Sequence, residues 1–273
     1  MRKPIIVAAQ KLYLNHTQAV GFAKCIRETV ASRRFDFEVL ISPSFISLAH
    51  VVEVLRDSGV LVAAQNFHQV DSGGLTGQVS LRELLDLEVP YVMLGHSEVR
   101  KYQGDTDEVV REKIRACIAQ GVRPIICVGE SATEHEAGRA DQILELQVVR
   151  LLGGLDGIHK AIVAYEPEWG VRGVPEIASM CESIRDAHAV IRQTLKTHCG
   201  GEAGDLVRIL YGGGVTQKIV HTLIVIPGVD GVLLGRDGVS ETSFVSVLDS
   251  VEKVLVRGLE QRNRVFAAAP FHR

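Results

Sequence analysis

The sequence has no long apolar run and no excess of charge of either sign. None of its apolar stretches approaches the roughly 18 residues that a membrane-spanning helix needs. Ile5–Ala9, near the start, is too short for the apolar core of a signal peptide, so we expect no secretion signal and no membrane partner. The net charge of -3, from 33 acidic and 30 basic residues, excludes the bulk positive field that would attract nucleic acid.

Paired cysteine motifs are also missing. The five cysteines are odd in number, widely spread and form no Cys-x-x-Cys pair, and the ten histidines show no metal-ligand spacing. We therefore expect no disulfide framework, no metal site and a cytoplasmic protein with reduced thiols. The cysteines are Cys25, Cys117, Cys127, Cys181 and Cys199.

Aromatic residues are scarce, at 5%, but apolar residues make up 46% of the 273 residues, which excludes a disordered chain. The length allows one or two domains. No Pro/Ser-rich linker or low-complexity segment divides the chain, so we predict one domain over residues 1–260. Residues 261–273 lack periodicity and are predicted to form a C-terminal tail.

Short β-branched runs alternate with longer amphipathic segments. Because the short runs are continuously apolar, they are typical of parallel strands covered on both faces. Eight such units favour a single closed (β/α)8 barrel, an α/β fold. The predicted strands are Ile5–Ala9, Glu38–Ser42, Val60–Gln65, Tyr91–Gly95, Pro124–Gly129, Ala161–Glu166, Val207–Tyr211 and Gly231–Gly235. The predicted helices are Thr17–Arg33, Leu48–Arg56, Leu81–Leu87, Asp105–Ala119, Ala140–Leu152, Pro175–Leu195, Thr216–Ile226 and Glu241–Val256.

In such a barrel the active site lies in the loops after the carboxyl ends of the strands. Chemically capable residues follow five of the predicted strands. They are Lys11 and Tyr13 after the first, His96 after the fourth, Glu166 at the end of the sixth, and the glycine-rich segments 212–214 and 235–238 after the last two.

The glycine-rich segments have two interpretations. Glycines at strand–helix joints can simply make turns, or their backbone N–H groups can approach a phosphate that a following helix dipole also favours. Two such segments on adjacent last strands favour phosphate. A Gly-x-Gly-x-x-Gly segment after a strand is absent, which argues against a dinucleotide cofactor, and we expect no cofactor.

His96 and Glu166 can form an acid/base set. A carboxylate in a dry position can have its pKa raised and act as a general base, while a nearby imidazole donates a hydrogen bond. Structural alternatives remain for each residue. His96 could be a satisfied buried histidine, and Glu166 could pair with Arg100.

Several segments resemble the triosephosphate isomerase family, in the family's order and over essentially Ile5 to about Val256. The segment around His96, Tyr91–Arg100, and the segment Tyr-Glu-Pro-x-Trp are highly specific together. The matching segments are Ala63–Asn66, Leu75–Ser80, Tyr91–Arg100, Gly104–Glu108, Pro124–Glu130, Glu136–Gly138, Ala164–Trp169, Tyr211–Gly213 and Asp230–Gly235.

The resemblance implies an isomerase that moves a proton between adjacent carbons of a short phosphorylated sugar, as in glycolysis and gluconeogenesis. By analogy Glu166 is the base and His96 polarises the carbonyl through an ene-diol. Gly214, Gly235 and the backbone at Arg236 would hold the phosphate. The segment from Gln65 to Ser80 resembles the loop through which family members pair, so a homodimer is implied.

The chain departs from the family pattern at the first loop. The family has Asn-x-Lys-x-Asn there, and alignment on Asn15 puts Lys11 at the first asparagine and Tyr13 at the lysine. Positions 11 and 13 of an extended strand share a face, so we hypothesise that Lys11 reaches the site from one pleat earlier.

Three further departures surround the expected phosphate position. Only Gly170–Val174 separates Trp169 from Pro175, which shortens the family's closing loop; Gly173 of this loop is an expected substrate contact. The family's serine after Tyr-Gly-Gly is Gly214, and Arg236 replaces a glycine and adds a cation.

Three interpretations follow from this pattern. The chain is a triosephosphate isomerase with an unusual first loop, an isomerase of another phosphorylated ketose such as a tetrulose phosphate, or a non-catalytic barrel that binds a sugar phosphate. Glu166 and His96 count against the third, whereas Tyr13 and the short closing loop count against the first.

Overall fold

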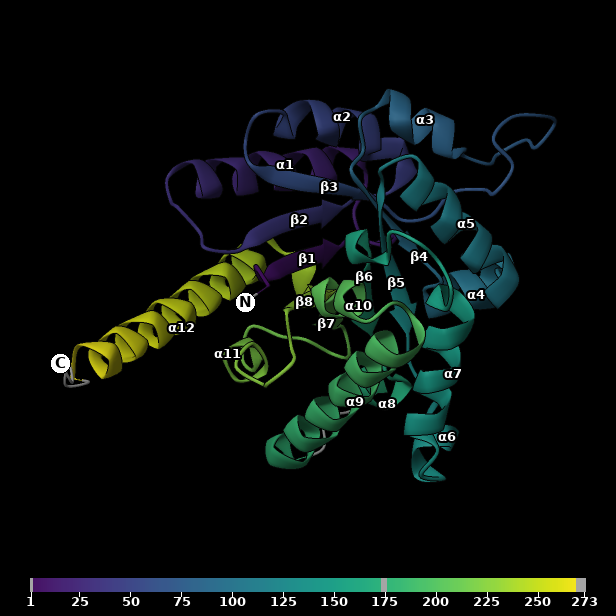
Figure 1. The fold of residues 1–273 in the computed structure, drawn as a ribbon. Coiled ribbons are helices and arrows are strands. Elements are labelled where there is room, and N and C mark those ends of the chain that lie inside the picture. Colours follow the sequence, from purple (N-terminus) through teal and green to yellow (C-terminus); the bar gives the residue numbers. More distant parts are fainter. Residues whose placement is uncertain (1, 173–175, 269–273) are drawn as a thin grey trace.

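Eight parallel strands close into a barrel in which each strand pairs with the next and β8 pairs with β1 (Figure 1). The structure is a computed structural model that describes residues 2–172 and 176–268. The fold predicted from the sequence, a single (β/α)8 barrel, is confirmed. The strands are β1 (Ile5–Ala9), β2 (Glu38–Ser42), β3 (Val60–Ala64), β4 (Tyr91–Leu94), β5 (Arg123–Val128), β6 (Ile162–Tyr165), β7 (Arg208–Tyr211) and β8 (Gly231–Leu234).

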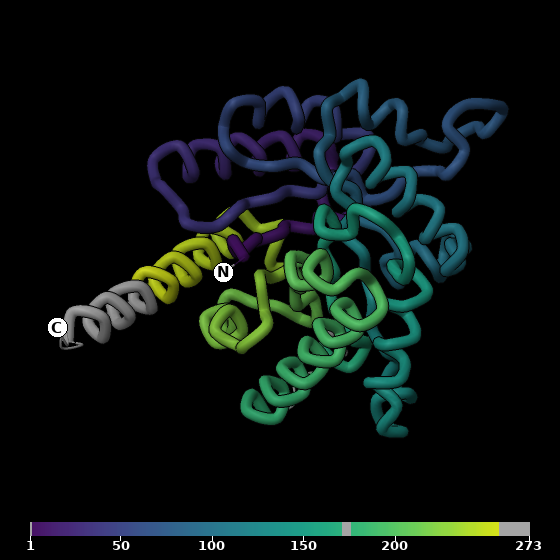
Figure 2. Tube along the Cα trace, viewed as in Figure 1, coloured from purple at the N-terminus to yellow at the C-terminus, as the bar shows by residue number. Residues whose placement is uncertain are grey.

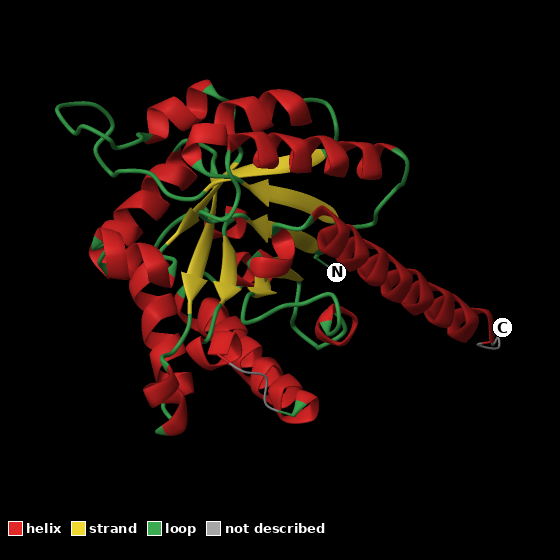
Figure 3. Cartoon of the chain, turned by 180° about the vertical axis from the view of Figure 1, so that it is seen from behind, coloured by secondary structure: helices red, strands yellow, loops and turns green. Residues whose placement is uncertain are grey.

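The helices surround the strands, which occupy the middle of the molecule (Figure 3). They are α1 (His16–Ala31), α2 (Phe45–Leu55), α3 (Leu81–Asp86), α4 (Ser97–Gln103), α5 (Asp107–Ala119), α6 (Ala132–Glu136), α7 (Ala140–Leu152), α8 (Glu168–Arg172), α9 (Ile177–His198), α10 (Glu202–Leu206), α11 (Val220–Leu223) and α12 (Glu241–Ala268). Two 3-10 turns, η1 (Ile158–Lys160) and η2 (Arg236–Gly238), complete the order.

The continuous apolar runs fill two separate cores. Alternate residues of each strand point into the barrel, where Val7, Leu40 and Leu233 belong to the inner core. The residues between them face outward and pack with buried helix residues such as Phe22 and Leu144. Burial on both sides is why these strands have no polar alternation.

Local capping sets where several helices begin. Asn15 and Gln18 form a reciprocal capping box at the start of α1, and Ser131 and Glu134 do so at α6. The predicted helix over 216–226 is much shorter, because only Val220–Leu223 is α-helical. At the other end of the chain, α12 continues to Ala268, into the segment predicted as a tail.

The connection from β3 to α3 extends away from the barrel (Figure 1). Its residues 69–78 are all exposed. The trace in Figure 2 shows that this loop and the start of α12 lie on different sides of the molecule. No described helix is long and apolar enough to cross a membrane.

Candidate active site

A cavity of about 800 Å³ opens at the carboxyl ends of the strands. Parallel strands bring their following loops to one end of a barrel, so residues far apart in sequence meet there. The structure brings together Lys11, Tyr13, His96, Glu166, Gly214, Gly235 and Arg236 on the cavity wall. The remaining expected site residue, Gly173, lies outside the described residues.

Glu166 follows β6 and is held by its backbone and by two glycines. Its N–H donates to the carbonyl of Val128, at 2.8 Å. A Cβ on Gly212 would lie 2.6 Å from Cγ of Glu166, and a Cβ on Gly129 would lie 2.3 Å from its carbonyl oxygen. Any larger residue at either position would therefore displace Glu166. Oε1 of Glu166 is buried without a hydrogen-bond partner among the described residues.

His96 follows β4 and lies against Glu166. The backbone N–H of Glu98 donates to Nδ1 of His96 at 3.1 Å, so Nδ1 is an acceptor and carries no proton. The proton of a neutral ring is then on Nε2, which donates to Oε2 of Glu166 at 3.2 Å. Main-chain geometry therefore selects the neutral tautomer that can donate into the cavity.

Opposing effects act on the pKa of Glu166. Burial raises it, but the charge and hydrogen bond of His96, the Cys127 thiol and the charge of Lys11 outweigh burial, and the pKa lies below its ordinary value. The sequence expectation of a raised carboxylate pKa is therefore wrong in direction. Burial lowers the pKa of His96, whereas Glu166 raises it, and the net direction is upward.

Lys11 enters the cavity through a turn. The strand β1 ends at Ala9, and Tyr13 N–H donates to the carbonyl of Gln10, so positions 11 and 13 do not alternate as in a strand. Lys11 has a left-handed backbone with φ of 48°. Gln65 stabilises this turn by donating its side-chain N–H to the carbonyl of Lys11 at 3.1 Å. The hypothesis that positions 11 and 13 share one face of a strand was therefore wrong, although Lys11 does line the cavity.

The ammonium group of Lys11 pairs with Oε1 of Glu98 at 2.9 Å. Its stem passes 3.9 Å from the place of a Cβ on Gly235, so Lys11 lies between Glu98 and the last glycine loop. Tyr13 lines the same cavity with its side chain more than half exposed. The structure therefore puts a cation, and not the tyrosine alone, at the position where the first loop meets the site.

The glycine loops after β7 and β8 lie next to each other. Gly214 has a left-handed backbone with φ of 64°, and Asp237 joins the loops by accepting from the N–H of Gln217 at 2.9 Å. Helices were expected at Thr216 after the first glycine segment and at Glu241 after the second, and α12 does begin at Glu241. The turn η2 lies between Gly235 and α12, and α11 begins only at Val220, so turns follow both glycine segments at this wall of the cavity.

One structural alternative is excluded by the geometry, and one site residue was missed. Arg100 pairs with Asp107 at 2.8 Å and donates to the carbonyl of Gly95, so it is not the partner of Glu166. Glu98 contacts both His96 and Lys11, yet the sequence prediction gave it no role. Its place two residues after His96, in the same motif, was the available signal.

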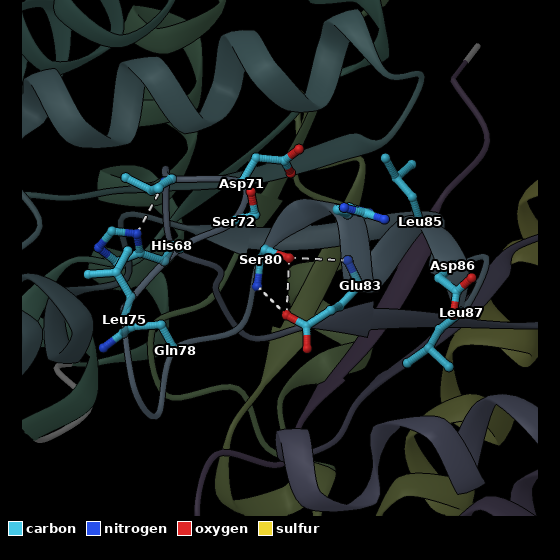
Figure 4. Close-up of a pocket in the computed structure, with 13 residues that line it drawn as sticks. His68, Asp71, Ser72, Leu75, Gln78, Ser80, Glu83, Leu85, Asp86 and Leu87 are labelled. Atoms are coloured by element: carbon cyan, nitrogen blue, oxygen red, sulfur yellow. Dashed lines mark hydrogen bonds between the residues drawn. The ribbon is translucent and has the colours of Figure 1, made fainter.

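A larger cavity, of about 1020 Å³, lies beneath the 69–78 loop, against α3 (Figure 4). Its walls include Ser80 and Glu83, which cap α3, and it contains none of the expected site residues. Size therefore does not identify the active site here. Among the described residues, no group of three or more His, Cys, Asp or Glu side chains could hold a metal ion.

Comparison with known proteins agrees with this geometry. The family model for triosephosphate isomerase matches residues 4–251. A triosephosphate isomerase of Carboxydothermus hydrogenoformans is 37% identical over 252 residues, which cover 91% of this chain and 98% of the relative. Another, of Solibacter usitatus, is 36% identical over 255 residues, covering 91% and 100%. A third, of Citrifermentans bemidjiense, is 37% identical over 250 residues, covering 91% and 98%. The chain belongs to the triosephosphate isomerase family.

Proposed function

We propose that this chain interconverts dihydroxyacetone phosphate and glyceraldehyde 3-phosphate, the glycolytic reaction that the family name implies. The observation that carries the proposal is the 3.2 Å contact of Glu166 with His96 in a cavity that also holds Lys11. A carboxylate base, a neutral N–H donor and a cation are the groups that a proton shift beside a carbonyl requires. The names of the relatives support this substrate pair over another ketose phosphate.

The reaction proceeds through an ene-diol, with Glu166 and His96 each giving and taking one proton. Glu166 takes a proton from the hydroxymethyl carbon, and the electrons of that C–H bond form the carbon–carbon double bond. The carbonyl oxygen gains negative charge, which Nε2–H of His96 neutralises. His96 then recovers a proton from the neighbouring hydroxyl, and Glu166 returns its proton to the former carbonyl carbon. This sequence gives the aldehyde and restores both side chains.

Substrate must separate the two side chains that are in contact. His96 Nε2 donates to Glu166 in the described arrangement, so a substrate oxygen takes over this donor and the carboxylate is left facing carbon. The depressed pKa of Glu166 keeps it ionised at neutral pH, ready to accept a proton. The upward pull of Glu166 on the pKa of His96 weakens once substrate lies between them.

Phosphate binds at the wall of the cavity that the loops after β7 and β8 form. Gly214 and Gly235 line this wall, and glycine lets a backbone N–H group approach a phosphate closely. Arg236 adds a guanidinium that suits a phosphate geometrically and electrostatically. Lys11 lies between this wall and Glu98, where it stabilises the negative charge that develops during proton transfer.

A coupled assay with glyceraldehyde 3-phosphate tests the function. Glu166→Gln removes the base while keeping the shape of the side chain, and we expect turnover to fall at least 1000-fold. Glu112→Gln, on the exposed side of α5, is the matched control and should retain full turnover. Equal turnover of wild type and Glu166→Gln would refute the assignment of the base.

The same assay separates the two alternative functions. Absence of turnover of the triose phosphates together with solvent deuterium exchange into a tetrulose phosphate would replace the proposed substrate. Absence of exchange into either sugar phosphate would indicate a binding protein without catalysis. Neither alternative is favoured by the relatives, all three of which carry the name triosephosphate isomerase.

We also propose a homodimer formed by the loops after β1 to β4. These four strands are neighbours in the barrel, and each following loop or helix carries an exposed apolar side chain: Leu12, Ile46, Leu75 and Tyr102. Exposed apolar groups gathered at one edge are typical of an interaction surface. The projecting 69–78 loop, which also lines the cavity against α3 (Figure 4), supports this surface as the place where a second copy docks.

Sedimentation equilibrium tests the dimer. We expect twice the chain mass of 29.8 kDa at micromolar concentration. The double change Ile46→Glu with Leu75→Glu should shift the population to monomer, because charges would be buried without partners. Leu206→Glu, at another exposed apolar position, before β7, is the control and should stay dimeric. A monomer mass for wild type would refute the dimer.

A cytoplasmic location is proposed on the state of the cysteines. All five thiols are free in the structure, and three of them are buried. Free buried thiols are compatible with a reducing compartment.

A further inference from the structure

Glu130 is a fully buried carboxylate beside the active site. It follows β5, and its side chain is 0% exposed. Oε1 accepts three hydrogen bonds: from the hydroxyl of Tyr165 at 3.0 Å, from Nε1 of Trp169 at 2.7 Å and from His135 at 3.1 Å. Oε2 has no hydrogen-bond partner among the described residues.

Two of these donors flank the proposed base. Tyr165 immediately precedes Glu166, and Trp169 follows it by three residues. The backbone carbonyl of Glu130 also accepts from the N–H of Glu168, at 3.1 Å. Glu130 therefore holds the segment 165–169 by three hydrogen bonds, and the position of the base depends on this clamp.

A buried carboxylate is costly unless a charge compensates it. Tyr165 and Trp169 are neutral donors, whereas His135 can become a cation. Among the described residues, His135 is the only group of that kind within 4 Å of Glu130. The ring of His135 is 37% exposed, so it can exchange protons with solvent while it touches the buried oxygen. It also packs on Trp169, with ring centroids 5.0 Å apart.

Two other carboxylates near α6 accept hydrogen bonds from groups other than His135. Glu134 accepts from the N–H and hydroxyl of Ser131, and Oε2 of Glu168 accepts from the N–H of Ala132. The charged residues on α6, the turn after it, α7 and α8 near this end are Glu134, Glu136, Arg139, Asp141 and Glu168.

We propose that His135 is a positioning residue: as a cation it completes the Glu130 clamp and fixes the segment that carries Glu166. This inference rests on the proposed function, because its catalytic consequence acts through the base. In the neutral state His135 retains a hydrogen bond but no longer compensates the charge of Glu130. The hold on Trp169 is then weaker, and Glu166 samples positions away from the substrate carbon.

Trp169 is the single tryptophan of the chain, so its fluorescence reports on the clamp directly. We expect the emission of wild type to change in one step as the pH passes through the protonation of His135. His135→Gln keeps a donor but cannot charge, and its emission should not titrate. His221→Gln, an exposed histidine on α11, should titrate as wild type. A titration unchanged in His135→Gln would overturn the proposal.

Turnover provides the second readout. We expect His135→Ala to lower kcat roughly 10-fold with a smaller change in KM, because a misplaced base loses rate more than binding. His135→Arg supplies a permanent cation, and should restore kcat to within about twofold of wild type. An unchanged kcat in His135→Ala, or an arginine variant as slow as the alanine variant, would overturn the proposal. Thermal melting near that of wild type keeps the variants comparable.

The two readouts separate this inference from the proposed function. A wild-type protein without isomerase turnover would refute the function. The fluorescence titration does not depend on turnover, so it would still decide whether His135 controls the environment of Trp169.

Discussion

Lys11 Nζ and Glu98 Oε1 are 2.9 Å apart at the mouth of the barrel, although they are 87 positions apart in the chain. The pair holds a flexible ammonium group at one place on the cavity wall. Because Lys11 also lowers the pKa of Glu166, the pair links substrate binding to the state of the base.

Lys11→Met should lower kcat/KM at least 100-fold, since the neutral side chain cannot stabilise developing charge. The variant should also lose activity at a higher pH than wild type on the acid side. Lys11 favours ionised Glu166, so its removal raises the pKa at which the base takes up a proton. A pH profile of kcat/KM measures both effects.

Lys24→Met is the control for this change, because Lys24 is exposed on α1, away from the cavity. It should leave both the rate and the pH profile unchanged. Near-normal turnover of Lys11→Met would mean that Tyr13 or another group has taken over the role of the cation.

Gly212→Ala should damage the base without unfolding the barrel. Its Cβ would lie 2.6 Å from Cγ of Glu166, so the carboxylate must move. A displacement of about 1 Å can cost roughly 100-fold in rate, and we expect a loss of that order in kcat. Gly21→Ala in α1, where the nearest atom lies at 3.8 Å, should retain full activity. Steady-state kinetics and the melting temperature decide between a local and a global effect.

Arg236→Gly should raise KM roughly 10-fold and change kcat less. The guanidinium lies on the proposed phosphate wall, and phosphate binding contributes to the ground state as well as to the transition state. Added salt should raise KM of wild type more than KM of the variant, because screening weakens the interaction that only wild type has. A KM equal to that of wild type would remove Arg236 from the binding site.

His188 should make the fold sensitive to mild acid. It is buried in α9, with Nδ1 against the carbonyl of Gly228 at 3.1 Å. Burial lowers the pKa of His188 from 6.5 to about 4. The unfolded chain binds this proton first, so stability falls as the pH drops from about 6.5 to about 4 and is unaffected by this group above that range. The loss amounts to about 3 kcal/mol at about 1.4 kcal/mol per pKa unit.

His188→Asn retains a donor toward Gly228 and cannot titrate. The free energy of unfolding of this variant should therefore fall less between pH 6.5 and pH 4 than that of wild type, as measured by urea denaturation. Identical slopes for the two proteins would show that His188 is not protonated on unfolding. Protonation of Glu166 and of other carboxylates at lower pH lowers the free energy of unfolding of both proteins equally.

The barrel could be predicted from the sequence because its strands are buried on both sides. Val7 and Leu40 face inward while their neighbours face the helices, so the apolar runs are continuous and unmistakable. One long amphipathic helix, Ala140–Leu152, was predicted to the residue, and the predicted bounds of α1, α5 and α9 differ by one to three residues. Short helices such as α6 and α8 were missed, because five residues are too few for periodicity.

The residues of the site could be predicted from the sequence, whereas several of the contacts among them could not. The rule that strand ends carry the chemistry placed Glu166 and His96 in one cavity. The left-handed backbone of Lys11 could not be foreseen, because lysine seldom adopts it and Gln65, distant in sequence, stabilises the turn. The direction of the pKa shift of Glu166 likewise depends on the distances from its carboxylate to His96, Cys127 and Lys11, which the composition does not contain.

Glu98 donates to His96 with its main-chain N–H, whereas its side-chain carboxylate accepts a hydrogen bond from Lys11. A substitution at position 98 can therefore remove the partner of Lys11 and still leave the N–H that fixes the tautomer of His96, since every residue except proline supplies the same N–H. The protonation pattern of His96 is in this sense inherited from the path of the chain. Mutation at position 98 can change the charge of this active site while the tautomer of His96 persists as long as the main chain keeps this path.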